Sequence, residues 1–103
     1  MKPHYSEFVR HCIRYYVLTL DEGKGGLPRF RSDAERDNWN ACHQVLKDYP
    51  VRDMDIISQL YRPGDTLPYK IHAMSKSEQI SQNTLWNMVG DTEKKIAKKR
   101  GLI

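Results

Sequence analysis

The stretch that decides the fold is residues 65–101, DTLPYKIHAMSKSEQISQNTLWNMVGDTEKKIAKKRG. Apolar side chains recur in it at helical intervals on either side of a short break at residues 78–80. The residues with this spacing are Leu67, Ile71 and Met74 or Ala73 before the break, and Leu85, Val89, Thr92 and Ile96 after it. We therefore expect one helix to about residue 77, a short turn, and a second helix over residues 81–100.

Both helices carry residues that favour helix ends. Asp65 or Thr66 can cap the first helix, and Pro68 is tolerated in its opening turn. Ser81 stands where the second helix needs an N-cap. Gly101 follows the last apolar position, which is the usual place of a C-terminal cap.

Upstream of this stretch we expect two more helices, over about residues 32–49 and 52–61. Ser32 with Glu35 forms a capping box, and Pro50 ends the helix that they begin. The second of these helices stops at Arg62-Pro63-Gly64. The apolar residues expected to face the core are Trp39, Cys42, Leu46 and Tyr49 in one helix, and Met54, Ile57, Leu60 and Tyr61 in the other.

The N-terminal part shows helical spacing over about residues 5–20. Tyr5, Phe8, Val9, Cys12, Ile13 and Tyr16 lie on one side, with Glu7, Arg10 and Arg14 on the other. The β-branched and aromatic residues 13–20 also fit a strand, but the spacing before them favours a helix. Residues 21–31 hold three glycines and a proline and are expected to be a loop. Gly23-Lys24-Gly25-Gly26 lacks the glycine spacing and the Ser or Thr of a phosphate-binding loop, which argues against nucleotide binding.

The expected fold class is all-α, a compact bundle of four to five helices in a single domain over residues 1–103. Residues 1–50 would form an N-terminal helical scaffold, and residues 51–103 a helix-turn-helix region. No run approaches the ~18 apolar residues of a membrane span, and the first ten residues lack the apolar run of a signal peptide. Two cysteines make no disulfide framework, so the expected location is cytoplasmic.

The charge is unevenly distributed along the chain. Lys and Arg number 17 and Asp and Glu 13, which gives a formal net charge of +4. Basic and acidic residues balance over residues 1–61, so the whole excess lies in residues 62–103. A basic region suits a polyanionic partner.

Two helices joined by a short turn can form a helix-turn-helix, a DNA-binding motif that places the start of its second helix in the major groove. Here that start is polar and consists of Ser81, Gln82, Asn83, Thr84 and Asn87, with Trp86 among them. Asn and Gln can pair with adenine through two hydrogen bonds. The candidate phosphate contacts around this surface are Lys70, Lys76, Lys94, Lys95, Lys98, Lys99 and Arg100. The sequence therefore predicts binding to double-stranded DNA.

A family resemblance covers residues 39–103. The residues that carry it are Val45-Leu46, Ile56-Ile57, Leu60-Tyr61, Thr66-Leu67, Ile71, Ile80-Ser81, Thr84-Leu85 and Ile96-Ala97-Lys98-Lys99-Arg100-Gly101-Leu102. In these the chain resembles sigma-like phage and prophage regulators of the ArpU and RinA type, and more distantly region 4 of sigma factors. The resemblance implies a small transcriptional regulator whose recognition helix begins at Ser81. Because one such module discriminates poorly between sites, we also expect RNA polymerase or a second copy of the chain as partner.

Each feature also has a purely structural interpretation. Ser81 can serve as a cap alone, Trp86 can belong to the core, and residues 93–100 can form a solvated helix face. The alternative functions are a protein-interaction module that keeps the helix-turn-helix shape without binding DNA, and a phage packaging subunit. The interaction module would use exposed aromatic residues among Tyr5, Tyr15, Tyr16, Phe30 and Trp86.

Two chemical functions are not expected. His11-Cys12 and Cys42-His43 are adjacent pairs, whereas zinc ligands are usually spaced two to four residues apart. Cys12 and Cys42 lie on apolar helix faces and are expected to be core residues, which makes a cysteine nucleophile improbable. We therefore expect no enzyme, no metal and no cofactor.

Overall fold

The computed structural model describes residues 3–22 and 29–103, and all the regular structure in these ranges is helical. The helices are α1 (Ser6–Glu22), α2 (Asp33–Leu46), α3 (Val51–Tyr61), α4 (Leu67–Glu78) and α5 (Gln82–Lys99). The all-α prediction is thereby confirmed. None of the described helices is long and apolar enough to cross a bilayer.

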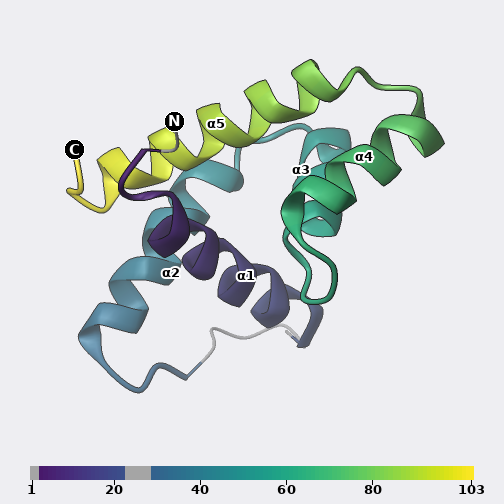
Figure 1. Ribbon diagram of the computed structural model, residues 1–103. Coiled ribbons are helices and arrows are strands. Elements are labelled where there is room, and N and C mark those ends of the chain that lie inside the picture. The colour runs from purple at the N-terminus through teal and green to yellow at the C-terminus, as the bar shows by residue number, and fades with distance from the viewer. Residues whose placement is uncertain (1–2, 23–28) are drawn as a thin grey trace.

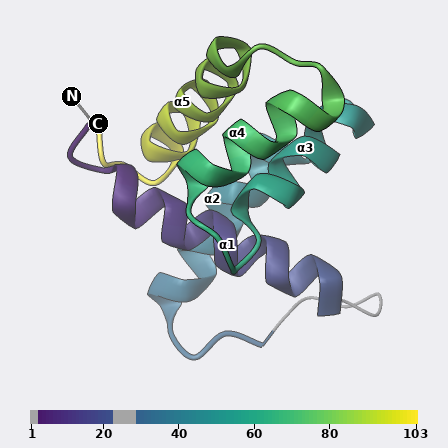
Figure 2. The same cartoon turned by 45° about the vertical axis from the view of Figure 1, so that its right-hand side comes forward.

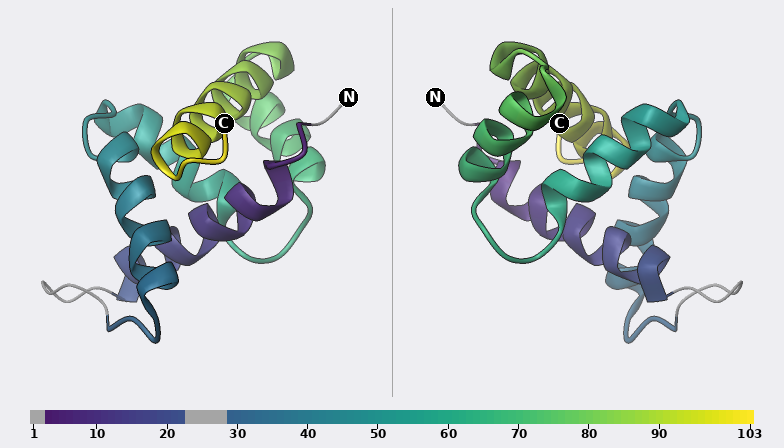
Figure 3. Two further views of the ribbon diagram at one scale, coloured as in Figure 1. Left: turned by 90° about the vertical axis from the view of Figure 1, so that its left-hand side faces the viewer. Right: turned by 90° about the vertical axis from the view of Figure 1, so that its right-hand side faces the viewer.

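All five helices contribute to one hydrophobic core. Its fully buried side chains include Ile13 of α1, Cys42 of α2, Ile57 of α3, Ile71 of α4 and Leu85 of α5, each 0% exposed. Helix α5 lies along one edge of the molecule, with the other helices on its inner side (Figure 1 and Figure 3). It packs against α1, α2 and α4, while α3 packs beside α4 and against α1 (Figure 2). The inner face of α5 is therefore buried by elements from the whole length of the chain.

Helix α1 confirms the helical interpretation of residues 13–20 and extends through Glu22, two residues into the predicted loop. The glycine-rich motif at residues 23–26 lies outside the described residues. The prediction that Arg10 lies on the solvent side of α1 is wrong. Its side chain is buried because it forms an ion pair with a carboxylate of α5.

Helix α2 begins as predicted but ends early. Ser32 Oγ accepts a hydrogen bond from the Glu35 backbone N–H at 3.2 Å, and the Glu35 carboxylate accepts from the Arg31 N–H rather than closing the box on Ser32. The helix stops at Leu46, and residues 47–49 form a turn, with Tyr49 N–H donating to the Leu46 carbonyl. The expected run to residue 49 is therefore too long, because the side chain of Tyr49 is held by α5.

Helix α3 ends and helix α4 begins where the sequence predicts. Gly64 has φ +132°, a conformation that an L side chain rarely adopts, and it ends the segment after α3. Thr66, not Asp65, is the N-cap residue of α4, although its side chain forms no capping hydrogen bond. Met74 is buried and Ala73 exposed, which settles the alternative left open by the spacing.

Candidate nucleic-acid interface

The turn between α4 and α5 consists of residues 79–81, one residue later than predicted, because α4 includes Glu78. Gln79 adopts the left-handed conformation, with φ 55° and ψ 42°, which is uncommon for a residue other than Gly. The Ser75 hydroxyl donates to the Ile80 carbonyl at 2.5 Å, and Ile80 packs against the core. These contacts fix the start of α5 relative to α4.

Ser81 occupies the N-cap position of α5 without capping it. Its backbone has φ −57° and ψ 138°, and its side chain forms no hydrogen bond with the first turn of the helix. The predicted N-cap position is therefore confirmed, but the side chain of Ser81 does not supply the capping hydrogen bond. Ser81, Gln82, Asn83 and Thr84 are all exposed, so the first turn of α5 faces solvent.

The two faces of α5 differ sharply. Its inner face carries Leu85, Val89, Thr92 and Ile96, each at most 1% exposed. The other side is exposed, and a turn of about 100° per residue brings five of its residues within an arc of about 80°, with exposed Asp91 directly beside them. We call this set the outer stripe; it consists of Asn83, Asn87, Gly90, Lys94 and Lys98. Along the stripe, neutral amides occupy the N-terminal half of the helix and ammonium groups the C-terminal half.

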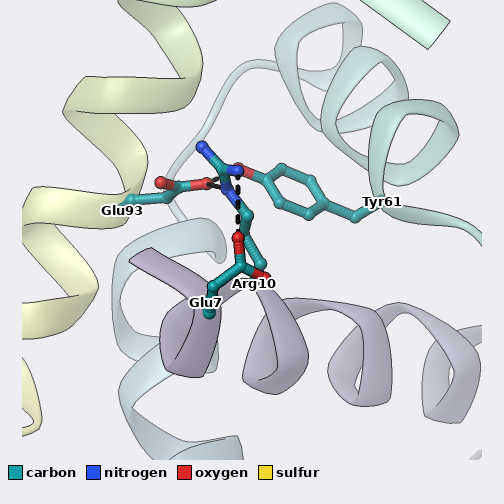
Figure 4. A network of polar contacts seen from close by, with 4 residues as sticks. All are labelled: Glu7, Arg10, Tyr61 and Glu93. Carbon is teal, nitrogen blue, oxygen red and sulfur yellow. Dashed lines mark hydrogen bonds and ion pairs between the residues drawn. The ribbon is translucent and has the colours of Figure 1, made fainter. Parts of the chain in front are cut away.

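A buried polar network holds α5 in this rotation (Figure 4). Arg10 Nε of α1 donates to Glu93 Oε2 at 2.8 Å, and Tyr61 OH of α3 donates to the same oxygen at 2.6 Å. Glu93 is only 3% exposed, so the expectation of a solvated face over residues 93–100 is wrong at this position. Burial, together with the charge of Glu93, raises the pKa of Tyr61, so this hydroxyl keeps its proton and remains a donor.

Two further hydrogen bonds join α5 and its C-cap to α2 and the turn that follows α2. Tyr49 OH lies 2.7 Å from Thr92 Oγ1, and Arg100 Nε donates to Asn38 Oδ1 at 2.6 Å. At the end of α5, Gly101 has φ +79° and Leu102 N–H donates to the Ala97 carbonyl at 2.8 Å, which confirms the predicted glycine cap. The inner face of α5 is thus fixed from three helices while its outer stripe stays uncovered.

The predicted phosphate contacts do not all lie together. Lys94 and Lys98 lie on the outer stripe, and within the described residues neither has a hydrogen bond or ion pair. Lys95 lies beside the stripe, 3.0 Å from an Asp91 carboxylate oxygen and 5.6 Å from the centre of the Tyr49 ring. Its hydrogen bond to Asp91 raises the pKa of Lys95.

The two lysines of α4 lie in different surroundings. The ammonium group of Lys70 donates to the Arg62 carbonyl, and partial burial lowers its pKa. It therefore holds the loop between α3 and α4 and does not join the outer stripe. Lys76 is exposed near the C-terminal end of α4.

The amide groups at the start of α5 also differ from one another. Gln82 Nε2 lies 3.1 Å from His72 Nδ1 of α4, so this side chain is held across the turn. The side chains of Asn83 and Asn87 form no hydrogen bond with any described residue. Trp86 is half-buried and packs against the core, which matches its structural interpretation more closely than that of a base contact.

Two residues of this surface were missed from the sequence. His72 was not singled out, because its contact with Gln82 arises only once α4 and α5 are folded against each other. Gly90 lies in the interior of α5, where Gly costs about 1 kcal/mol relative to Ala. A glycine inside a predicted helix lowers the expected stability of that helix. This was the only feature of the sequence that could have drawn attention to position 90.

The aromatic surface proposed for an interaction module is not exposed. Tyr16 is 3% exposed and belongs to the core, which contradicts its place in that surface. Tyr5, Tyr15, Phe30 and Trp86 are partly buried and pack against the core. The larger exposed apolar side chains are instead scattered over the described helices and the C-terminus: Phe8, Leu18, Leu20, Val51, Tyr69 and Ile103.

The two cysteines are buried and free, as expected for core residues. Burial raises the pKa of the Cys12 thiol to about 11 and also raises that of Cys42. In the part of the chain that the structure describes, no three His, Cys, Asp or Glu side chains are grouped so as to hold a metal ion.

Comparison with known proteins identifies no relative. Neither a protein family, nor a curated protein, nor a solved structure matches the chain. The function is therefore inferred from the geometry of α4, the turn at residues 79–81 and α5.

Proposed function

We propose that this protein binds double-stranded DNA, with α4 and α5 as its helix-turn-helix and α5 as the recognition helix. The observation that carries the proposal is the pair of exposed amides at Asn83 and Asn87, which have no intramolecular partner in the described chain. They are one turn apart on the outer stripe, so both can reach base edges in the same groove.

The packing of α5 supports this role. A helix that enters the major groove must present one polar face while the fold anchors the other. The Arg10–Glu93–Tyr61 network and the Tyr49–Thr92 hydrogen bond anchor the inner face, and the Arg100–Asn38 hydrogen bond anchors the end of the helix. The residues at the start of the helix, from Ser81 to Thr84, are exposed and lie in the position from which such helices contact bases.

The charge distribution also supports DNA binding by α4 and α5. Lys94 and Lys98 continue the line of the two asparagines toward the C-terminal end of α5, and Lys76 projects from α4. Exposed cations on both helices of the motif favour contact with phosphates, which fix the register without selecting sequence. The similarity to sigma-like phage and prophage regulators supports transcriptional control as the use of this binding, with RNA polymerase or a second copy as partner.

Binding is tested by fluorescence anisotropy with a labelled duplex of mixed sequence, at salt concentrations from about 50 to about 200 mM. We expect the logarithm of the association constant to fall linearly with the logarithm of salt concentration, with a slope near −0.9 per phosphate contacted. Absence of binding at the lowest salt concentration would contradict the proposal and favour the interaction module.

A matched pair of variants distinguishes the loss of particular phosphate contacts from a general decrease in positive charge. Lys94→Gln/Lys98→Gln removes two positive charges from the outer stripe, and Lys47→Gln/Arg52→Gln removes two from exposed sites at the end of α2 and on α3. The first variant should weaken binding to every duplex and reduce the slope by about 2, whereas the second should change the slope little. Equal losses in both variants would indicate attraction by overall charge alone.

A further inference from the structure

No contact with the described residues requires a glycine at position 90. It lies in the interior of α5 and is exposed, and its φ is not in the left-handed region. A Cβ atom added at this position would meet no atom within 4 Å. Neither backbone conformation nor internal packing therefore requires glycine here, although Gly weakens a helix interior.

The surroundings of Gly90 are specific. It is the one position of the outer stripe without a side chain, and it separates Asn87 from Lys94. The neutral amides lie on one side of this gap and the ammonium groups of Lys94 and Lys98 on the other. The gap therefore lies where the surface changes from groups suited to bases to groups suited to phosphates.

Distances along the helix match the dimensions of DNA. With a rise of 1.5 Å per residue, Gly90 lies about 7.5 Å along the axis from the midpoint between Asn83 and Asn87. The major groove of B-DNA is about 12 Å wide, so its rim lies about 6 Å from its centre. With the axis of α5 directed across the groove and the asparagines at its centre, Gly90 lies close to the rim and Lys94 lies about 6 Å beyond Gly90.

We infer that the sugar–phosphate strand at the groove rim crosses α5 at Gly90, and that the missing side chain lets it approach the helix backbone. This inference rests on the proposed DNA binding and specifies how α5 lies in the groove. Lys94 and Lys98 then contact the same strand beyond the crossing. Asp91 beside the crossing is paired with Lys95 at 3.0 Å, which offsets its repulsion of the strand.

The test compares Gly90→Gln with Ala34→Gln, which places the same uncharged side chain on an exposed position of α2. Gln is a far better helix former than Gly, so Gly90→Gln should raise the thermal midpoint by several degrees. Loss of binding in this variant then cannot come from unfolding. We expect Gly90→Gln to lose affinity on the order of tenfold for all duplexes alike, as expected for a contact with the backbone. Ala34→Gln should bind as the unchanged protein does.

Three results would overturn the inference, and each is distinct. Equal binding by Gly90→Gln and the unchanged protein would show that no strand passes close to this position. A changed sequence preference, in place of a uniform loss, would mean that Gly90 faces base edges and not the backbone. Failure of the unchanged protein to bind any duplex would remove the proposed function itself, and the inference with it.

Discussion

Arg10 of α1 and Glu93 of α5 form a buried ion pair across 83 residues of sequence, with Nε and Oε2 2.8 Å apart. The pair joins the first helix to the last, and Tyr61 adds a hydrogen bond from α3 to the same carboxylate oxygen. Because Glu93 lies on the inner face of α5, this contact fixes the rotation of the helix about its axis. That rotation decides which residues form the outer stripe.

Removal of the Glu93 carboxylate should destabilise the protein strongly. Glu93→Ala removes the buried partner of Arg10 and leaves its guanidinium only the exposed Glu7 carboxylate, 3.7 Å from Nη1. Loss of a buried partner of this kind costs about 3–5 kcal/mol in the free energy of unfolding. Urea unfolding followed by circular dichroism measures this loss, and Asp91→Ala, which removes an exposed carboxylate two residues earlier on the same helix, is the control. The control should unfold close to the midpoint of the unchanged protein.

The same network can be replaced as a unit. Arg10→Met/Glu93→Met/Tyr61→Phe leaves no charge and no hydroxyl unpaired in the core, so it should recover part of the stability that Glu93→Ala loses. A triple variant no more stable than Glu93→Ala would mean that the loss came from packing and not from the unpaired charge.

Prediction from the sequence succeeded where apolar spacing alone decides the outcome. Ile71 and Leu85 belong to series of apolar residues whose helical spacing places each series on one face of its helix. Both side chains are fully buried, as this spacing predicts. Gly64 and Gly101 were expected at ends of elements and adopt positive φ there. These features depend on residues close together in sequence.

The incorrect predictions concern residues that are far apart in the sequence but in contact in the fold. Arg10 was expected in solvent, since no local pattern shows that Glu93 will lie beside it in the fold. Helix α2 was expected to continue to residue 49, but the Tyr49 hydroxyl pairs with Thr92, 43 residues later. For the candidate site, the polar start of α5 was predictable from its residue types. The engagement of Lys70 with the Arg62 carbonyl and of Gln82 with His72 was not, because both arise from packing between helices.

Asp91 provides a test of charge beside the proposed crossing. Its carboxylate is 62% exposed and lies one residue after Gly90. Asp91→Asn should increase DNA affinity several-fold, because it removes repulsion of phosphate and releases the Lys95 ammonium. Asp37→Asn, at an exposed position of α2, is the control and should bind as the unchanged protein does. Anisotropy titrations at one fixed salt concentration compare the two, and an equal affinity for both variants would place the DNA away from Asp91.

Stability should fall at alkaline pH. Burial raises the pKa of Cys12 from 9.0 to about 11 and also raises that of Cys42, so the unfolded chain loses these protons at a lower pH than the folded one. Their contribution is therefore complete below about pH 9 and is lost as pH rises through about 11. Tyr61, whose pKa is also raised, adds to the loss above its ordinary value of 10.0.

Urea unfolding at about pH 7.5 and about pH 10.5 measures this dependence, and the expected loss is about 2 kcal/mol from Cys12 alone, to which Cys42 and Tyr61 add. Cys12→Ala/Cys42→Ala lowers stability at both pH values but should reduce the difference between them. An undiminished difference in that variant would assign the alkaline loss to other groups.

In the proposed complex, Asn83 and Asn87 select the DNA sequence. Selection from a pool of duplexes with random sequence, followed by sequencing of the bound fraction, measures preference for the unchanged protein and for Asn83→Ala/Asn87→Ala. The control is Asn40→Ala/Gln44→Ala, which removes two exposed amides at the same spacing on α2. We predict that the unchanged protein and the control select the same sequence, and that Asn83→Ala/Asn87→Ala loses preference at the contacted positions while still binding DNA. An unaltered preference in that variant would contradict the account.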